Sequence, residues 1–364
     1  MTSVSRFVFV AGTRPEFVKL HPVALAAAER HMELALITTE QHTGSAMRDD
    51  FLERLEWPCP VERLDIDTRA PLPLLAGILT QLGDRLRQGD ALVAVGDTTS
   101  VLGASLVANK LRLRLAHVEA GLRSYDLRMP EEYNRRMCDH LADDLFAPTG
   151  LDARHLAEER CPGRSHVVGN TVMDAVRLNA GRLPSSTAFG SGYVLLTIHR
   201  QENLDDPAFV SAVATFLERT EESCVFPIHP RTRDAFARSG LLARVERRSN
   251  VRVCEPLDYL TFLAAMRDAR VILTDSGGVQ EEATAPAVRR PVIVLRRSTE
   301  RVAAIEAHFS VLAPFHPTRI AELTADLSWF KPAEHSPFGD GHAASRIVEI
   351  LINPRDPAGA ADRA

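Results

Sequence analysis

The chain has 364 residues, enough for about two domains of roughly 150 residues each. Its 45% hydrophobic and 25% charged residues are typical of a globular protein, and its formal net charge of -5 argues against bulk nucleic-acid binding. The sequence has no signal-peptide pattern and no apolar stretch near the roughly 18 residues of a membrane span. We therefore expect a cytoplasmic protein with neither nucleic acid nor membrane as partner.

Five cysteines are scattered along the chain without a CxxC pair. An odd number at irregular spacing indicates small buried residues in a reducing compartment rather than a disulfide framework. The sequence also lacks an HExxH helix, a Cys/His cluster, an EF-hand loop and a GxSxG elbow. We therefore expect no metal, no cofactor and no serine-hydrolase chemistry.

Short apolar runs alternate with longer amphipathic ones along the whole chain. The strands expected in the first half are Arg6–Ala11, Leu34–Thr38, Leu92–Val95, Leu115–Val118 and Leu145–Ala147. Those expected in the second half are Val167–Val168, Val194–Ile198, Val225–Ile228, Val251–Cys254, Val271–Leu273 and Val292–Leu295. Continuous hydrophobic runs indicate strands buried on both faces. With helical patterns between them, such as Val101–Lys110 and Tyr259–Arg267, they predict an α/β protein of two Rossmann-like, doubly wound parallel sheets.

One interrupted block, GDTTSVLGASLVA from Gly96 and HVEAGLRSYDLRMPEEYNRR from His117, concentrates charged residues in strand-to-helix loops. Its charged members are Asp97, Glu119, Glu131, Glu132, Arg123 and Arg135. Carboxylates and guanidiniums gathered where strands end suit acid/base chemistry on a polyanionic substrate. His117 lies inside a strand pattern and reads as a core histidine.

The segment GTRPEFVKL follows the first strand and predicts a helix that begins near Pro15. Arg14 at the strand end and Lys19 one turn into the helix would attract phosphate, since a helix N-terminus favours anions. The alternative is that Pro15 only starts a helix whose charges are solvated.

The segment DSGGVQEEA follows the strand VILT and predicts an anion-binding turn. Gly277 and Gly278 let backbone N–H groups approach a ligand closely, and Ser276 offers a hydroxyl. Glu282 could accept hydrogen bonds from ribose hydroxyls. No GK[ST] follows the glycines, so the segment is not a Walker A loop.

Several histidines come directly after expected strands. His199, in LLTIHRQEN, could bind a phosphate or a sugar hydroxyl from its place after the first strand of the second domain. His229 in PIHPRTR reads as structural or solvated, and Gln41–His42 forms a polar loop that could serve only as a cap.

Taken together, the chain resembles the non-hydrolysing UDP-N-acetylglucosamine 2-epimerases through ordered stretches that read GTRPE, GDTTS, HVEAGLRS, MPEEYNRR, GNTVMD, HRQEN, DSGGVQEE and STER. The match runs from about residue 8 to about residue 350. The resemblance implies a homodimer with a GT-B fold, in which two Rossmann-like domains surround a cleft. It implies a domain 1–172 that carries catalytic carboxylates, a UDP-binding domain 173–345, and a region 346–364 with a helix that returns to the first domain and a disordered tail.

The resemblance also implies roles for individual residues. The positions that match the catalytic set are Asp97, Glu119, Glu131 and His199. The positions that match UDP contacts are Arg14, Lys19, Phe262, Ser276, Gly277, Gly278 and Glu282. Arg135 and Arg301 are further candidates for contact with the sugar or phosphate, and Phe262 reads equally well as a core residue of its helix.

The reaction that the resemblance implies is elimination of UDP from a UDP-hexosamine to a glycal, followed by its return with C2 inverted. UDP-N-acetylglucosamine is the expected substrate. A hydrolysing relative, an epimerase of non-acetylated UDP-glucosamine and a GT-B glycosyltransferase remain alternatives. Three departures bear on the choice: Arg297 and Val302–Ala303 flank the TER motif, TAPAVRRPVIV lacks the usual glycine, and TTEQHTGSAMRD departs from the pattern of members with a second UDP-sugar site.

Overall fold

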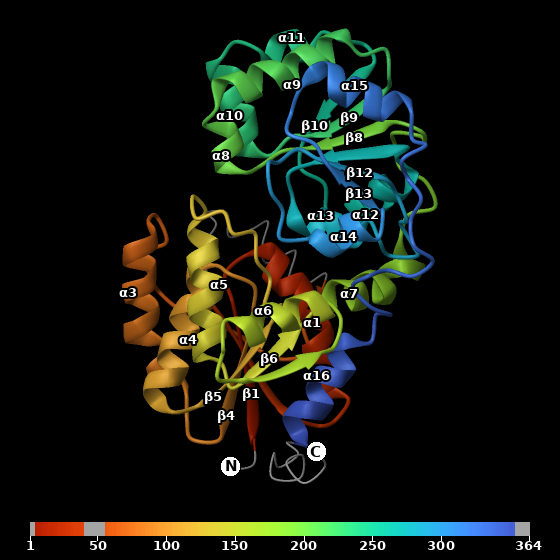
Figure 1. Cartoon of the computed structure of the whole chain (residues 1–364). Helices are drawn as coiled ribbons and strands as arrows, with labels where there is room; N and C mark the ends of the chain where they lie inside the picture. Colours follow the sequence, from red (N-terminus) through yellow and green to blue (C-terminus); the bar gives the residue numbers. More distant parts are fainter. Residues whose placement is uncertain (1–3, 40–54, 354–364) are drawn as a thin grey trace. The chain divides into compact units, whose positions relative to one another are not determined.

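The computed structural model describes residues 4–39 and 55–353. The loop at Gln41–His42 and the expected C-terminal tail lie outside these residues. The chain divides into two compact units, one formed by residues up to Ala175 together with those from Gly339, and the other by Val176–Phe338 (Figure 1). The resemblance described above implies boundaries after residues 172 and 345.

The first unit is built on a parallel sheet whose order, within the described residues, is β3-β2-β1-β4-β5-β6-β7. Its strands are β1 (Arg6–Ala11), β2 (Glu33–Thr38), β3 (Val61–Arg63), β4 (Asp90–Val95), β5 (Arg114–Val118), β6 (Asp144–Ala147) and β7 (Arg164–Val167). The order reverses between β1 and β4, the arrangement of a doubly wound sheet. Ligands bind such sheets outside the carboxyl ends of the strands at this reversal.

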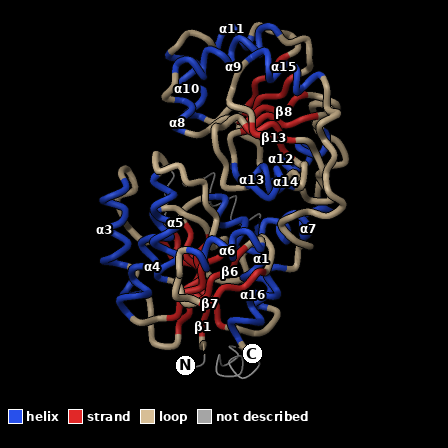
Figure 2. Tube along the Cα trace, in the orientation of Figure 1, coloured by secondary structure: helices blue, strands red, loops and turns tan. Residues whose placement is uncertain are grey.

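Helices cover both faces of this sheet (Figure 2). They are α1 (Arg14–Ala28), α3 (Pro71–Gln81), α4 (Thr99–Leu111), α5 (Pro130–Leu141), α6 (Gly150–Glu158) and α16 (Ala343–Ile352). Helix α7 (Thr171–Asn179) crosses the boundary between the two units. Successive β1 residues point to opposite faces, so Phe7 and Phe9 join a core with α1 and α16. Val8 and Val10 join a second core with α3 and α4.

Helix α16 comes from the far end of the chain, yet it belongs to the first unit. The Asp174 carboxylate accepts hydrogen bonds from the backbone N–H groups of Ala343 (3.1 Å) and Ala344 (3.0 Å) at the start of α16. These bonds satisfy N–H groups that have no partner within the helix. Ile347 and Leu351 then pack into the core shared with α1.

The second unit is built on another parallel sheet, ordered β10-β9-β8-β11-β12-β13 in the described residues. Its strands are β8 (Val194–Thr197), β9 (Cys224–Pro227), β10 (Val251–Cys254), β11 (Val271–Thr274), β12 (Val292–Val294) and β13 (Ser310–Leu312). Its helices are α8 (Gln201–Leu204), α9 (Pro207–Arg219), α10 (Pro230–Arg238), α11 (Leu242–Glu246), α12 (Tyr259–Asp268), α13 (Gly277–Glu282), α14 (Val302–Glu306) and α15 (Pro317–Ala325).

The prediction of two doubly wound parallel sheets in an α/β protein is confirmed. The sequence analysis missed β3 and β13, each a three-residue strand at an edge of its sheet. No helix in the described part of the chain is both long and apolar enough to cross a membrane. All five cysteines are free.

Candidate functional site

Asp97 lies two residues beyond β4, at the edge of the sheet where the strand order reverses. The Gly96 backbone before it has φ +86°, a left-handed conformation that glycine adopts without strain. Arg135 of α5 pairs with the Asp97 carboxylate at 2.6 Å, and the Asn134 amide donates to the Asp97 carbonyl at 2.8 Å. The Asp97 side chain remains 25% exposed. The structure thus brings together Asp97 and Arg135, which the sequence analysis had only placed in the same block.

Glu119 comes directly after β5 and is buried. Its carboxylate accepts hydrogen bonds from the Lys19 ammonium at 2.5 Å and from the Asn170 amide at 2.6 Å. Its backbone is left-handed, with φ +66°, which is uncommon and costly for a residue other than glycine. Lys19, expected to contact phosphate, is therefore an ion-pair partner of Glu119 in this structure.

The neighbouring residues Glu131 and Glu132 in the first turn of α5 have different environments. Glu132 is fully buried and accepts hydrogen bonds from the backbone N–H groups of Ser124 and Tyr125, so its role is structural. Glu131 is half-buried, and its side chain forms no hydrogen bond or ion pair with the described residues. Of the two, Glu131 is the carboxylate that is available to a substrate.

Glu16 is a site residue that the sequence analysis missed. One oxygen of its buried carboxyl accepts from the N–H groups of Gly12 (2.6 Å) and Thr13 (2.9 Å), and the other from the Thr98 hydroxyl at 2.5 Å. Glu16 therefore joins the loop after β1 to the loop after β4, which carries Asp97. The T-x-x-E spacing of Thr13 and Glu16 is a capping-box signal, and could have identified it.

The stability of the fold should depend on pH through Glu16. Burial raises the pKa of Glu16 from 4.5 to about 7, despite the hydrogen bonds that it accepts. The folded chain therefore holds a proton that the unfolded chain has lost in this window. As pH rises from about 4.5 to about 7, Glu16 should lower the free energy of unfolding by about 3 kcal/mol. Denaturant titrations at several pH values across this range should show that the free energy of unfolding falls less with pH in Glu16→Gln than in the parent protein. An equal dependence on pH in the two proteins would refute the assignment.

Arg123 was expected beside the carboxylates at the strand ends, and this expectation is wrong. Its guanidinium, which is 1% exposed, pairs instead with Asp139 at 2.7 Å and Glu159 at 2.6 Å. Asp139 also contacts the ring of His117 on β5, so Arg123 belongs to a buried ionic network between β5 and α5. The partners lie on α5 and after α6, which no local pattern connects to Arg123.

In the second unit, His199 lies just beyond β8, as expected. Its Nδ1 atom is 3.2 Å from an oxygen of Asp275, and its side chain is 43% exposed. Asp275 is fully buried and accepts from the backbone N–H groups of His199 and Arg200. Burial acts to raise the pKa of Asp275, but the hydrogen bond with His199 and the other donors lower it overall. A fixed carboxylate thus orients an exposed imidazole.

The turn at Ser276, Gly277 and Gly278 begins α13 and packs against the STER segment. A Cβ atom on Gly277 would lie 2.8 Å from the Glu300 carboxylate, whereas one on Gly278 would meet nothing within 4 Å. Glu300 is itself held by guanidiniums, those of Arg296 at 2.9 Å and Arg301 at 3.0 Å. Arg301 is buried and also pairs with Glu281 of α13 at 2.7 Å. It therefore links the STER segment to the helix that begins at this turn.

The two glycines give a matched pair of variants. Gly277→Ala should displace Glu300 from its ion pairs and lower the free energy of unfolding by about 1–3 kcal/mol, the usual cost of overpacking. Gly278→Ala has open space and should unfold like the parent protein. Thermal unfolding of both variants measures the difference, and equal losses would show that Gly277 is not held against Glu300.

Three further predicted contact residues lie on separate helices. Arg14 is exposed in the first turn of α1, where Pro15 follows it as expected. Phe262 is half-buried on α12, and Glu282 is buried at the end of α13.

His229 caps α10: its ring accepts a hydrogen bond from the Arg231 N–H, which is the structural role that the sequence favoured.

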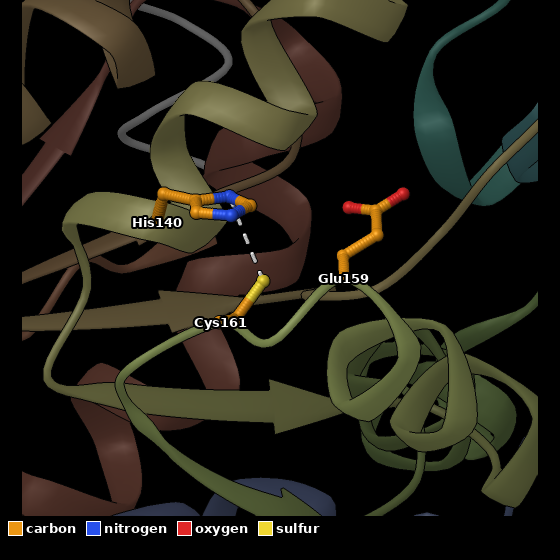
Figure 3. A group of neighbouring side chains, drawn as sticks. All are labelled: His140, Glu159 and Cys161. Atoms are coloured by element: carbon orange, nitrogen blue, oxygen red, sulfur yellow. Dashed lines mark hydrogen bonds between the residues drawn. The ribbon is translucent and has the colours of Figure 1, made fainter.

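One group of the described residues has the composition of a metal site: His140, Glu159 and Cys161, whose ligand atoms lie within 4.8 Å of one another (Figure 3). Protein groups already engage them. Arg123 holds both oxygens of Glu159, and His140 Nδ1 donates to the Arg136 carbonyl at 2.9 Å. Burial raises the pKa of the Cys161 thiol to about 11, which disfavours the thiolate that binds metals. We assign no metal to this group.

Comparisons with known proteins find sugar-nucleotide 2-epimerases that match nearly the whole chain. The family model described as UDP-N-acetylglucosamine 2-epimerase matches residues 24–352. A UDP-N-acetylglucosamine 2-epimerase of Methanocaldococcus jannaschii is 35% identical over 358 residues, covering 94% of this chain and 97% of that protein. A UDP-2,3-diacetamido-2,3-dideoxy-D-glucuronate 2-epimerase of Pseudomonas aeruginosa is 33% identical, covering 95% and 99%.

A solved structure is also similar over nearly the whole chain. The crystal structure of the M. jannaschii UDP-GlcNAc 2-epimerase in complex with UDP-GlcNAc and UDP gives a TM-score of 0.87 at 34% identity. The similarity covers 95% of this chain and 99% of that one. Together with the two parallel sheets, this likeness confirms the expected GT-B class of the fold.

Proposed function

Because this chain belongs to the UDP-N-acetylglucosamine 2-epimerase family, we propose that it inverts C2 of a UDP-hexosamine by the non-hydrolysing route. UDP-N-acetylglucosamine and UDP-N-acetylmannosamine are the proposed pair of sugars. The solved relative from M. jannaschii was crystallised with UDP-GlcNAc and UDP, which supports this choice. The observation that carries the proposal is the Asp97 carboxylate, which Arg135 of α5 holds at 2.6 Å. Glu131 lies one turn before Arg135 on the same helix and forms no hydrogen bond or ion pair with the described residues.

The proposed reaction has two halves. In the first, a carboxylate takes the C2 proton, the C1–O bond breaks towards the diphosphate, and UDP leaves behind a C1=C2 glycal. In the second, UDP returns to C1 and a proton is delivered to the other face of C2. Asp97 and Glu131 are the proposed acid/base pair, since each transfer needs a positioned carboxyl group.

Other residues have binding roles in this proposal. Glu119 and His199 position the sugar and diphosphate, with Lys19 and Asp275 fixing their side chains. The proposed UDP contacts are Arg14, Ser276, Gly277 and Gly278 at the diphosphate, Glu282 at the ribose and Phe262 at the uracil. Arg135 and Arg301 act by holding Asp97 and the STER segment. In this proposal the first unit supplies the catalytic carboxylates and Arg14, and the second unit supplies the other UDP contacts. We also propose a homodimer as the working form.

Proton NMR in D2O with UDP-N-acetylglucosamine tests the proposal. Deuterium should enter C2 as the UDP-manno sugar grows, without a build-up of free UDP. Equal amounts of UDP and free N-acetylmannosamine would instead establish the hydrolysing reaction. If neither appears, UDP-glucosamine with a free amine and the 2,3-diacetamido glucuronate named in the Pseudomonas relative are the next substrates.

The ribose contact gives a separate prediction. Glu282→Ala should weaken UDP binding about 10- to 100-fold, because a hydrogen bond to a charged group contributes about 1.5–3 kcal/mol. Isothermal titration calorimetry with UDP measures this loss. Glu322→Ala on the exposed side of α15 is the control and should bind UDP as the parent does. Unchanged affinity in Glu282→Ala would remove it from the ribose site.

A further inference from the structure

His117 lies in the middle of a buried ionic network that the proposed reaction does not use. Its side chain is 1% exposed, in β5. The ring Nδ1 lies 2.7 Å from an oxygen of Asp139, and Nε2 lies 2.8 Å from the Gly96 carbonyl oxygen. Both ring nitrogens are therefore engaged, each with an oxygen.

The two partners determine the protonation of the ring. The Gly96 carbonyl can only accept, so Nε2 carries a hydrogen. Asp139 accepts from the Gly121 N–H at 3.1 Å and pairs with Arg123, which keeps it ionised, so Nδ1 carries a hydrogen as well. Burial would lower the pKa of His117, but the hydrogen bond and charge of Asp139 raise it overall.

The charges that face His117 agree with this assignment. Asp139 comes from α5, Arg123 from the loop after β5, and Glu159 follows α6. Besides the ring, the network has the Asp139 and Glu159 carboxylates, the Arg123 guanidinium and the partly exposed Arg136 guanidinium, which lies 3.9 Å from Glu159. Asp139, the carboxylate that contacts the ring, is fully buried, and an imidazolium gives it a second cationic partner beside Arg123, which offsets the cost of burying its charge.

The Gly96 carbonyl belongs to the peptide bond that leads into Asp97. The Gly96 N–H donates to the Val118 carbonyl at 3.1 Å, so the chain is held on both sides just before Asp97. Helix α5 supplies Asp139 to the ring, and also supplies Asn134 and Arg135 to Asp97 itself. His117 thus ties the backbone at Asp97 to the helix that holds the Asp97 carboxylate.

We propose that His117 is a permanently protonated positioning residue, whose imidazolium clamps the Gly96–Asp97 peptide to Asp139 and so aims the Asp97 carboxylate. The inference rests on the proposed acid/base role of Asp97. His117 itself does not touch substrate.

The test combines ring NMR with kinetics on the full chain. In protein labelled with ¹⁵N-histidine, the His117 resonances, identified by their loss in His117→Gln, should show both nitrogens protonated from pH 6 to pH 9. His117→Gln should lower kcat about 10- to 100-fold with KM changed less than about threefold, since an aimed carboxylate matters most in the transition state. His140→Gln, exposed on α5, is the control and should keep the parent kcat.

Asp139→Asn supplies a second readout that packing alone would not give. Without the carboxylate, His117 should titrate closer to its ordinary value of 6.5. The kcat of this variant should then fall as pH rises through that region, a limb that the parent lacks. If His117→Gln does not fold, this pH dependence of kcat in Asp139→Asn tests the proposal in its place.

Two results would overturn the inference: a parent ring with one protonated nitrogen at pH 7, or a folded His117→Gln with the parent kcat. A parent protein that exchanges no C2 hydrogen with any UDP-hexosamine would overturn the proposed function instead. In that case the ring resonances would still decide whether the clamp is an imidazolium.

Discussion

Asp97→Asn is expected to lower kcat for C2 epimerisation by about 10³-fold or more while UDP affinity stays within about twofold. An amide cannot exchange a proton with C2, and positioned acid/base groups contribute about 10²–10⁴-fold. The amide oxygen can still accept from Arg135, and the Asn134 bond to the backbone is unaffected, so the loop should keep its shape. The proposed UDP contacts at α13 lie in the other unit and are unchanged.

Three measurements make this prediction decisive. Loss of deuterium incorporation at C2 gives the rate, calorimetry gives UDP affinity, and thermal unfolding shows that the variant is folded. Glu131→Gln should behave in the same way, and Asp65→Asn, exposed before α3, should match the parent in all three. A parent-like rate in Asp97→Asn would remove this carboxylate from the mechanism.

Much of the fold follows from local pattern. Strand β1 has the residues that the sequence predicts, Arg6–Ala11, because both of its faces are covered and its apolar run is continuous. Helix α12 differs by a single residue from the predicted Tyr259–Arg267. The edge strand β3, Val61–Arg63, has only a half-buried valine before two exposed charged residues, so its sequence lacks the signal on which the prediction depends.

The site was predictable only as far as neighbours in the chain reveal it. Asp97 and Glu119 follow strands, and their positions come from that fact alone. The sequence does not show that Lys19 pairs with Glu119, a residue 100 positions away, or that Arg123 turns towards Asp139. Long-range ion pairs depend on where the loops converge, which is a property of the packed sheet and not of either segment.

These pairings also change how the cations are understood. The sequence analysis treats Lys19 as a cation for the phosphate, and Arg135 and Arg301 as candidates for contact with the sugar or phosphate. In the structure each of them pairs with a carboxylate of the protein, respectively Glu119, Asp97 and Glu300. Their proposed first effect is therefore to fix acidic side chains, and any attraction for the diphosphate is reduced by those partners.

The largest stability effect is expected at the Lys19–Glu119 pair. Lys19→Met should lower the free energy of unfolding of the first unit by about 3–5 kcal/mol, because it leaves a buried carboxylate without its cation. The side chains of Lys19 and Glu119 are only 8% and 4% exposed, so water cannot replace the ammonium. An exposed pair such as Arg319–Glu322 should show little change when Arg319 is replaced by Met.

The two tryptophans allow the first unit to be followed by itself. Trp57 packs edge-on against Phe9 and Phe17 in the first unit, and Trp329 lies in the second. In a Trp329→Phe background, urea unfolding monitored by Trp57 fluorescence therefore reports the unit that holds Lys19. Lys19→Met/Glu119→Gln should recover most of the loss, because the carboxylate that was left uncompensated is then neutral. If the double variant is no more stable than Lys19→Met, the cost arises from packing around Lys19 and not from the buried charge.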